Sequence, residues 1–260
     1  MITINGHKSI EFAGIAGELL LENGAETSRV EDTIMRICNR AEITETEVVV
    51  FPTGIIINGI YDGERLTKAK RIRERDINMT IVSAVNDISR RFANGQLSLE
   101  EGLTNLDALK KNNPAVLPRL WIMSAGALAS GAATVLLGGT WGDFFPAIAA
   151  TAAVRIIIGT TAFNLAFVLQ HYLAGLFAGL IGSLFVEAGF GQHLDKIVVG
   201  ALLPMVPGVA LTNAIRDFIS GDLLSGTLRM VEALLIAAAL AGGVGFALTF
   251  YSGYLKSASF

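Results

Sequence analysis

The sequence predicts an α-helical membrane bundle of five transmembrane helices preceded by a small cytoplasmic α+β domain. Hydrophobic residues make up 52% of the 260-residue chain and charged residues only 17%, whereas soluble domains carry roughly 25% charged residues. Charged residues are concentrated in residues 1–113, and from Leu120 onward Ala, Leu, Ile, Gly and Phe dominate in runs long enough to cross a bilayer. We therefore expect a cytoplasmic domain over 1–113 and a five-helix transmembrane domain over 114–260.

The first residues, MITINGHKSIEF, lack the apolar run and flanks of a cleaved signal, so we expect this domain to remain in the cytoplasm. The single cysteine, Cys38, cannot form an internal disulfide, which suits a reducing compartment. It lies on the apolar side of a predicted helix and is interpreted as a core residue. The net charge of -3 gives no indication of a nucleic-acid partner.

Two helices open the domain. Apolar residues recur at helical spacing over 8–23, and Asn23-Gly24 is a typical helix stop. Ser28 followed by Glu31 predicts a capping box that begins the second helix. The buried side of this helix is expected to hold Val30, Ile34, Ile37 and Ala41.

The run GAETSRVE between these helices places Glu26, Arg29 and Glu31 close together. Two interpretations remain open. The charges form a structural ion-pair cluster, which is common at protein surfaces, or they form a small polar site.

From Thr46 the pattern becomes β-rich, with VVVF and IIING separated by turn residues and a second turn at Asp62-Gly63. The next strand leads into KAKRIRER, 68–75, the only dense basic run in the chain. This run either contacts anionic lipid headgroups or is a solvated edge strand. A helix over 77–92 follows, and Ser98 with Glu101 predicts the cap of a last helix.

The five spans are expected at 120–137, 144–162, 165–186, 197–215 and 230–251. Lys110, Lys111 and Arg119 precede the first span, which places the N-terminus in the cytoplasm and the C-terminus outside the inner membrane. Small residues at close-approach spacing predict helix contacts. They are Gly126 with Ser130, and Gly175 with Gly179 and Gly182.

The fourth span is predicted to break, because Pro204 and Pro207 lie inside it and Gly208 follows. Unpaired backbone costs roughly several kcal/mol per group in hydrocarbon, so the break is expected to be buried in protein or to line a watery cavity. These three residues are therefore candidates for substrate binding. The alternative is a kink used only for helix packing.

Polar residues follow the break, and one arginine lies within the second span. Asn213 and Asp217 are further substrate-binding candidates, while Asp217, Asp222 and Glu187 are candidate proton carriers. Arg155 lies near the middle of its span, where a charge costs roughly 2.5–3.5 kcal/mol. Its counter-charge is a substrate carboxylate, or one of the acidic residues Glu187, Asp217 and Glu232; the alternative is snorkelling to the membrane surface.

An odd number of spans means that a second similar unit joined in series enters the membrane in the inverted orientation, as in many transporters. The chain is therefore expected to form half of a transport path. A second membrane subunit or a second copy of the chain would complete the path.

The runs GELLLENGAETSRVEDT, 17–33, and PMVPGVALTNAIRDFISGDLLSG, 204–226, resemble the two hallmark stretches of the threonine/serine exporter (ThrE) family. The order of soluble domain, linker and five spans also matches. Within the family the chain resembles the YjjP-like larger subunit of the split, two-component form. The resemblance implies family motif positions at Glu26, Arg29 and Glu31 in the first run, and at Pro207, Gly208, Asn213, Asp217, Gly221, Asp222 and Gly226 in the second.

The resemblance implies export of threonine and serine driven by an ion gradient, without a cofactor, together with a small five-helix partner in the lipid bilayer. Dicarboxylates such as succinate are the alternative substrates. A hydrolase-like or regulatory soluble domain is a third possibility. The sequence disfavours an enzyme, because it has no G-x-S-x-G elbow and only His7 of three histidines lies in the soluble part. His171 and His193 are too isolated to predict a metal site.

Overall fold

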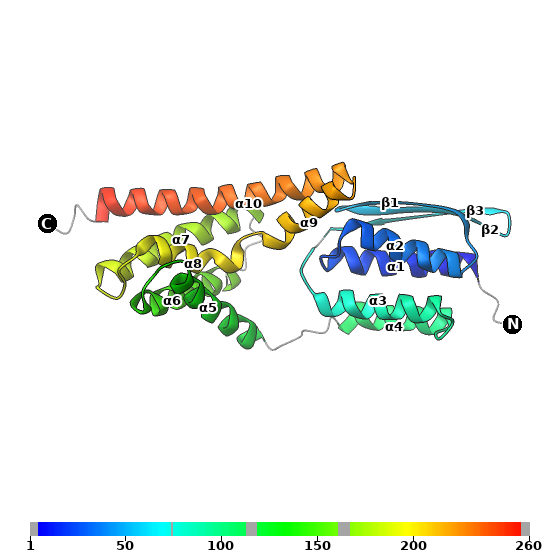
Figure 1. Cartoon of the computed structure of the whole chain (residues 1–260), viewed down its shortest axis with the longest axis horizontal. Coiled ribbons are helices and arrows are strands. Elements are labelled where there is room, and N and C mark those ends of the chain that lie inside the picture. The colour runs from blue at the N-terminus through cyan, green and yellow to red at the C-terminus, as the bar shows by residue number, and fades with distance from the viewer. Residues whose placement is uncertain (1–4, 74, 113–118, 161–166, 256–260) are drawn as a thin grey trace. The chain divides into compact units, whose positions relative to one another are not determined.

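The computed structural model describes residues 5–73, 75–112, 119–160 and 167–255, which form two compact units (Figure 1). The first unit combines Met1–Val116 with Val209–Met230, and the second combines Leu117–Gly208 with Val231–Phe260. The protein is mostly helical, with one small sheet. A later stretch of chain therefore belongs to the same unit as the N-terminal region.

The first unit begins with a helical hairpin, α1 (Gly6–Glu22) and α2 (Thr27–Arg40). Asn23 ends α1 and Gly24 adopts a left-handed φ of 89°, as the sequence predicts. The predicted capping box at the start of α2 is wrong. The helix already begins at Thr27, so Ser28 lies within its first turn, and the Glu31 carboxyl accepts a hydrogen bond from Val50 N–H instead.

Three strands, β1 (Thr44–Phe51), β2 (Gly54–Tyr61) and β3 (Glu64–Arg71), form an antiparallel sheet in chain order. The helices α3 (Met79–Ala93) and α4 (Leu99–Asn112) complete this part. The predicted cap of α4 is confirmed, because the Glu101 carboxylate accepts hydrogen bonds from Ser98 N (2.9 Å) and Ser98 Oγ (2.7 Å).

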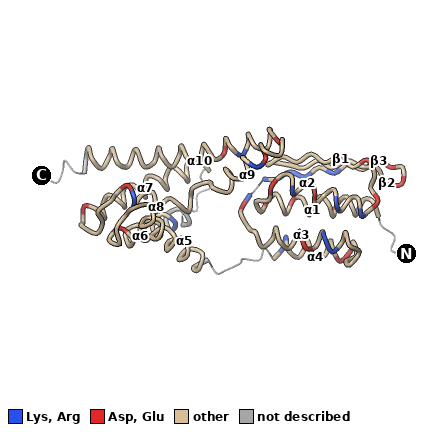
Figure 2. The backbone as a smooth tube through the Cα atoms, in the orientation of Figure 1, with Lys and Arg blue, Asp and Glu red and all other residues tan. Residues whose placement is uncertain are grey.

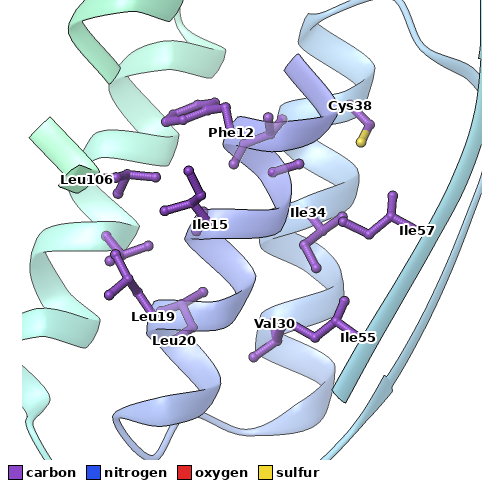
Figure 3. Packing of buried hydrophobic residues seen from close by; sticks show 14 of the residues in the cluster. Phe12, Ile15, Leu19, Leu20, Val30, Ile34, Cys38, Ile55, Ile57 and Leu106 are labelled. Atoms are coloured by element: carbon purple, nitrogen blue, oxygen red, sulfur yellow. The ribbon is translucent and has the colours of Figure 1, made fainter. Parts of the chain in front are cut away.

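The core of the first unit surrounds α1, which packs between α2 with the sheet on one side and α4 on the other (Figure 3). The predicted inward face of α2 is confirmed, since Val30, Ile34, Ile37 and Ala41 are fully buried. Cys38 is also fully buried, and burial raises the pKa of its thiol to about 12. A thiol with this pKa stays protonated at neutral pH, as expected of a core residue.

Part of the basic run is neutralised by α1. Lys68 pairs with Glu11, and Lys70 pairs with Glu11 (3.3 Å) and Glu18 (3.0 Å). Lys110 of α4 also reaches Glu18, at 2.7 Å. Burial alone would raise the pKa of Glu18, but the hydrogen bonds from Lys110 and Lys70 lower it below its usual value. The two lysines therefore join β3 to α1 and are not a solvated edge.

The second unit contains α5 (Arg119–Leu136), α6 (Trp141–Thr160), α7 (Phe167–Glu187), α8 (Leu194–Leu202) and most of α10 (Leu223–Phe250). By length and hydropathy, α7 and Leu223–Gly253 can each cross a membrane. A third span exists if the bent pair Leu194–Met205 and Gly208–Ile219 counts as one. The count of five spans stays a prediction; Lys256 and the ends of the second and third predicted spans lie outside the described residues.

Two turns of the second unit are joined by a buried carboxylate. Asp143, at the start of α6, is fully buried and accepts hydrogen bonds from Thr140 N (2.7 Å), Gln192 N (2.6 Å) and His193 N (3.0 Å). The His193 ring also contacts Asp143, at 2.9 Å. The turn before α6 is thereby attached to the turn before α8, which gives this charged residue a structural role.

Small residues bring α7 and α10 into contact, as the spacing of Gly175, Gly179 and Gly182 predicts. A side chain at Gly175 would collide with the Leu240 carbonyl, and one at Gly179 would lie 2.6 Å from the Ala247 Cβ. Gly182 instead faces α8, where its nearest neighbour would be Val198. Helix backbones that approach this closely are typical of membrane bundles.

We expect Gly243→Leu to destabilise the second unit strongly, because a side chain there would collide with the Tyr172 carbonyl and the Leu176 N–H of α7. Overpacking typically costs about 1–3 kcal/mol, and more where backbone must move. Thermal unfolding of the purified protein in detergent measures the effect. Gly245→Leu is the matched control, two residues away on the same helix with open space around it. Equal melting temperatures for the two variants would contradict the packing.

Candidate functional site

The chain breaks where the two prolines predict it. α8 ends at Leu202, a short 3-10 turn covers Leu203–Met205, and α9 (Gly208–Ile219) begins after Pro207. Pro204 and Pro207 are half-buried and Gly208 is exposed. The break itself is thus confirmed, whereas its contact with a solute stays a prediction.

α9 and the start of α10 form a tight hairpin. Gly221 adopts a left-handed φ of 88°, and the Asp222 N–H donates to the Asp217 carbonyl at 2.8 Å. A side chain at Gly226 would lie 2.6 Å from the Phe218 ring, so a glycine is needed for this close approach. Two glycines of the second hallmark run are thereby explained by turn geometry.

This hairpin carries a buried ion pair. Asp217 of α9 is 1% exposed and lies 3.1 Å from Arg229 Nε of α10, which is 6% exposed. The hydroxyl of Thr27, the first residue of α2, donates to Asp217 Oδ2 at 3.3 Å. We call Thr27, Asp217 and Arg229 the Asp217 cluster. It joins residues that are 190 positions apart in the sequence.

Further bonds connect the hairpin to the loop between α1 and α2. Asn213 Nδ2 donates to the Gly24 carbonyl at 3.2 Å, and Arg229 Nη2 donates to the Ala25 carbonyl at 3.1 Å. Arg216 forms an ion pair with Glu26. The two hallmark runs of the sequence therefore contact each other directly, within the first unit.

The site holds more acidic than basic groups. Burial raises the pKa of the Glu31 carboxyl, and the nearby charges of Asp222, Asp32 and Asp217 raise it further, against an opposing hydrogen bond from Val50 N–H. The carboxyl of Glu31 therefore binds a proton at a higher pH than an ordinary glutamate. Because Glu31 lies close to Asp32, Asp217 and Asp222, uptake of a proton relieves repulsion among these carboxyls. Within the described ranges no group of His, Cys, Asp and Glu has the arrangement of a metal site.

The remaining candidates lie elsewhere. Arg155 is half-buried on α6 beside Gly126 of α5, and its Nε makes no hydrogen bond to any described residue. Glu187, at the exposed end of α7, accepts a hydrogen bond from the Tyr251 hydroxyl at 2.6 Å. Arg29 is exposed and contributes no side chain to the ion pairs found among the described residues, whereas Glu26 pairs with Arg216.

Sequence reasoning missed how these parts combine. It treated the two hallmark runs as separate features and assigned no role to Thr27 or to the carbonyls of Gly24 and Ala25. It also gave Arg229 no role in the site. The available signal was the pair of opposite charges, Asp217 and Arg229, on either side of the Gly221 turn.

Comparison with known proteins gives the family. The model of the family described as "Putative threonine/serine exporter" matches residues 11–251. The chain belongs to the threonine/serine exporter family. No solved structure matches it.

Similar curated members of the threonine/serine exporter family differ in length. "Probable succinate transporter subunit YjjP" of Klebsiella aerogenes is 26% identical over 237 residues, which cover 89% of this chain and 90% of that protein. The Escherichia coli protein of the same name is 26% identical over 241 residues, which cover 90% and 91%. "Probable threonine/serine exporter" of Mycobacterium tuberculosis is 25% identical over 240 residues, covering 87% of this chain but only 43% of that protein.

Proposed function

We propose that this chain is the larger subunit of a two-component secondary transporter that exports threonine and serine. One observation carries the proposal. The chain matches 90% and 91% of the length of two relatives that are named as transporter subunits, and 43% of the longer exporter of Mycobacterium tuberculosis. The remainder of such a transporter would come from a small five-helix membrane subunit or from a second copy of this chain. Its relatives of matching length carry the word "subunit" in their names.

In the proposed mechanism, the substrate binds at the break between Pro204 and Gly208, where the chain leaves regular α-helix geometry. Arg155 attracts the substrate carboxylate, and the hydrogen-bonding capacity that its buried Nε does not use within the described residues supports this role. Asn213 and Asp217 were further substrate candidates. Because Asn213 is bonded to the loop between α1 and α2 and Asp217 to the first residue of α2, we assign both to control of the α9–α10 hairpin instead.

The proton step is assigned to the carboxyls around the Asp217 cluster. Protonation of Asp217 would remove its charge attraction to Arg229 and weaken the hydrogen bond that its carboxyl accepts from Thr27. Glu31 and Asp222 would pass or share the proton, which the raised pKa of Glu31 supports. The hairpin that follows the helix break would then be released from α2. Glu187, held by Tyr251, remains a second candidate carrier.

We further propose that the chain lies in the inner membrane with a cytoplasmic N-terminus and an outer C-terminus, and that it acts as a transporter without being an enzyme. Succinate is the alternative substrate. The specific observation in its favour is that the relatives of matching length are named as succinate transporter subunits. Threonine, serine and succinate all carry a carboxylate, so Arg155 would serve either substrate.

Transport by membrane vesicles tests the proposal. Vesicles that contain this chain with a co-expressed five-span subunit should export threonine and serine, and vesicles with either subunit alone should not. Export of succinate but not of threonine would favour the alternative. Equal activity of this chain alone would contradict the two-component assignment, and absence of transport for all three substrates would overturn the function.

A further inference from the structure

We propose that Arg71, Arg73 and Arg75 form a binding site for the phosphate headgroup of an anionic phospholipid. The three arginines, with Thr53 and Ile72, line a hollow of about 550 Å³ on the surface of the first unit. Arg71 and Arg73 belong to the part of the basic run that forms no ion pair with Glu11 or Glu18 in the described part of the chain. It does not depend on the transported substrate.

Strand alternation separates the basic run into two sets. Leu66, Lys68, Lys70 and Ile72 point toward the helices, as their burial and the ion pairs with α1 show. Arg71 and Arg73 point to the other face and are exposed. Ile72 N–H donates to the Thr53 carbonyl at 3.0 Å, which holds the segment after β3 beside the turn between β1 and β2. Figure 2 shows basic residues along β3 and the segment that follows it.

The two sets also differ in charge balance. Lys68 and Lys70 are neutralised by Glu11 and Glu18. In the described part of the chain, no carboxylate pairs with Arg71 or Arg73. Guanidinium groups bind phosphate oxygens through paired N–H donors, so neighbouring arginines on one surface suit a phosphate-bearing ligand.

The location selects a lipid as the source of the phosphate. Gly54 is paired with both Phe51 and Arg71, so the arginines lie at the same end of the sheet as the β1–β2 turn. Ser225, near the start of α10, donates to the Val50 carbonyl at that same end, at 3.3 Å. From there α10 continues as an apolar helix long enough to cross a membrane, Leu223–Gly253. Only a few residues of α10 separate Ser225 from this apolar stretch, so chain continuity brings the arginines within reach of lipid headgroups in our proposal.

Binding of a short-chain lipid to the purified full-length protein in neutral detergent tests this site. Dioctanoyl phosphatidylglycerol is titrated against the parent chain and against the triple variant Arg71→Gln, Arg73→Gln, Arg75→Gln. We expect the triple variant to bind at least about tenfold more weakly, since each basic residue near a membrane surface contributes to attraction of anionic lipid. The triple lysine variant should retain part of the affinity, because charge remains but the paired donors are lost.

The matched control is Arg40→Gln, Arg90→Gln, Arg91→Gln, which removes the same charge from the ends of α2 and α3. α2 begins beside Asp217 and α3 begins beside Asn23, and each helix is roughly 20 Å long, so the control arginines lie about one helix length from these starting points. This control should change affinity less than twofold. Equal weakening by both triple variants would overturn the site, because only net charge would then matter.

Two other ligands distinguish an anionic lipid from a neutral lipid and from free phosphate as the bound species. Dioctanoyl phosphatidylcholine should bind to the parent chain at least tenfold more weakly than dioctanoyl phosphatidylglycerol, because its headgroup carries no net charge. Inorganic phosphate that competes as well as the lipid would overturn the lipid assignment in favour of a free anion. Because the test measures binding by one subunit, it can fail while the transport function stands, and the reverse also holds.

Discussion

Asp217→Asn is expected to abolish export while the protein still folds in the membrane. The substitution keeps the shape of the side chain and leaves the buried Arg229 without its counter-charge. Removing one partner of a buried ion pair costs about 3–5 kcal/mol, and the asparagine oxygen offsets part of this cost by accepting the hydrogen bond from Thr27. The variant also mimics a permanently protonated Asp217. Because it cannot exchange a proton, we expect at least a tenfold loss of export in vesicles that hold both subunits.

The controls separate loss of function from loss of folding. Asp87→Asn makes the same chemical change at an exposed ion pair of α3 and should leave both export and melting temperature unchanged. The double variant Asp217→Asn, Arg229→Gln removes both buried charges, so it should recover stability relative to the single variant and remain inactive. Normal export by Asp217→Asn would refute the proton role, and recovery of export by the double variant would reduce the cluster to a structural one.

Arg155→Ala is expected to abolish export without lowering stability. In the proposed second span, a charge near the middle costs roughly 2.5–3.5 kcal/mol. Among the described residues, no carboxylate pairs with Arg155. Asp217 and Glu187, two of its predicted partners, bond to Arg229 and Tyr251 respectively. An arginine kept only for packing would be replaced at little cost, so loss of activity in a variant of equal or higher stability identifies a functional charge.

Efflux and thermal unfolding are measured together for this series. Arg155→Lys should retain less than a tenth of the export, because an ammonium cannot hold a carboxylate through paired donors. Ile156→Ala is the matched control, since it is the next residue of α6 and is 53% exposed. Unimpaired export by Arg155→Ala would remove the proposed carboxylate contact, and a large drop in its melting temperature would indicate a structural role instead.

Local sequence patterns predicted much of the first unit. The β-rich runs VVVF and IIING, separated by turn residues, predicted β1 and β2. The Ser98 cap of α4 was predicted from two residues only three positions apart. Helical spacing also placed Val30 and Cys38 in the core. These features depend on the backbone and on neighbours within a few residues, so they can be predicted without the fold.

Predictions were weaker where distant residues compete for the same groups. The capping box at Ser28 failed because Glu31 bonds to Val50 of a strand. The last span was expected from residue 230, whereas α10 begins at Leu223 and its first turns belong to the first unit. Hydropathy finds the apolar part of a helix, and it does not report polar turns that are stabilised by contacts with another element.

The sequence by itself determined that this is a helical, membrane-type chain with a small α+β region. It also determined that the fourth apolar segment breaks between Pro204 and Gly208. Both could be predicted because composition, periodicity and proline geometry act locally. Only the tertiary structure decided that Asp217 lies between Thr27 and Arg229, and that Lys70 pairs with α1 while Arg71 stays exposed. A buried charge needs partners close in space, and the first unit brings the hydrogen-bond donor Thr27 to Asp217 from 190 residues away.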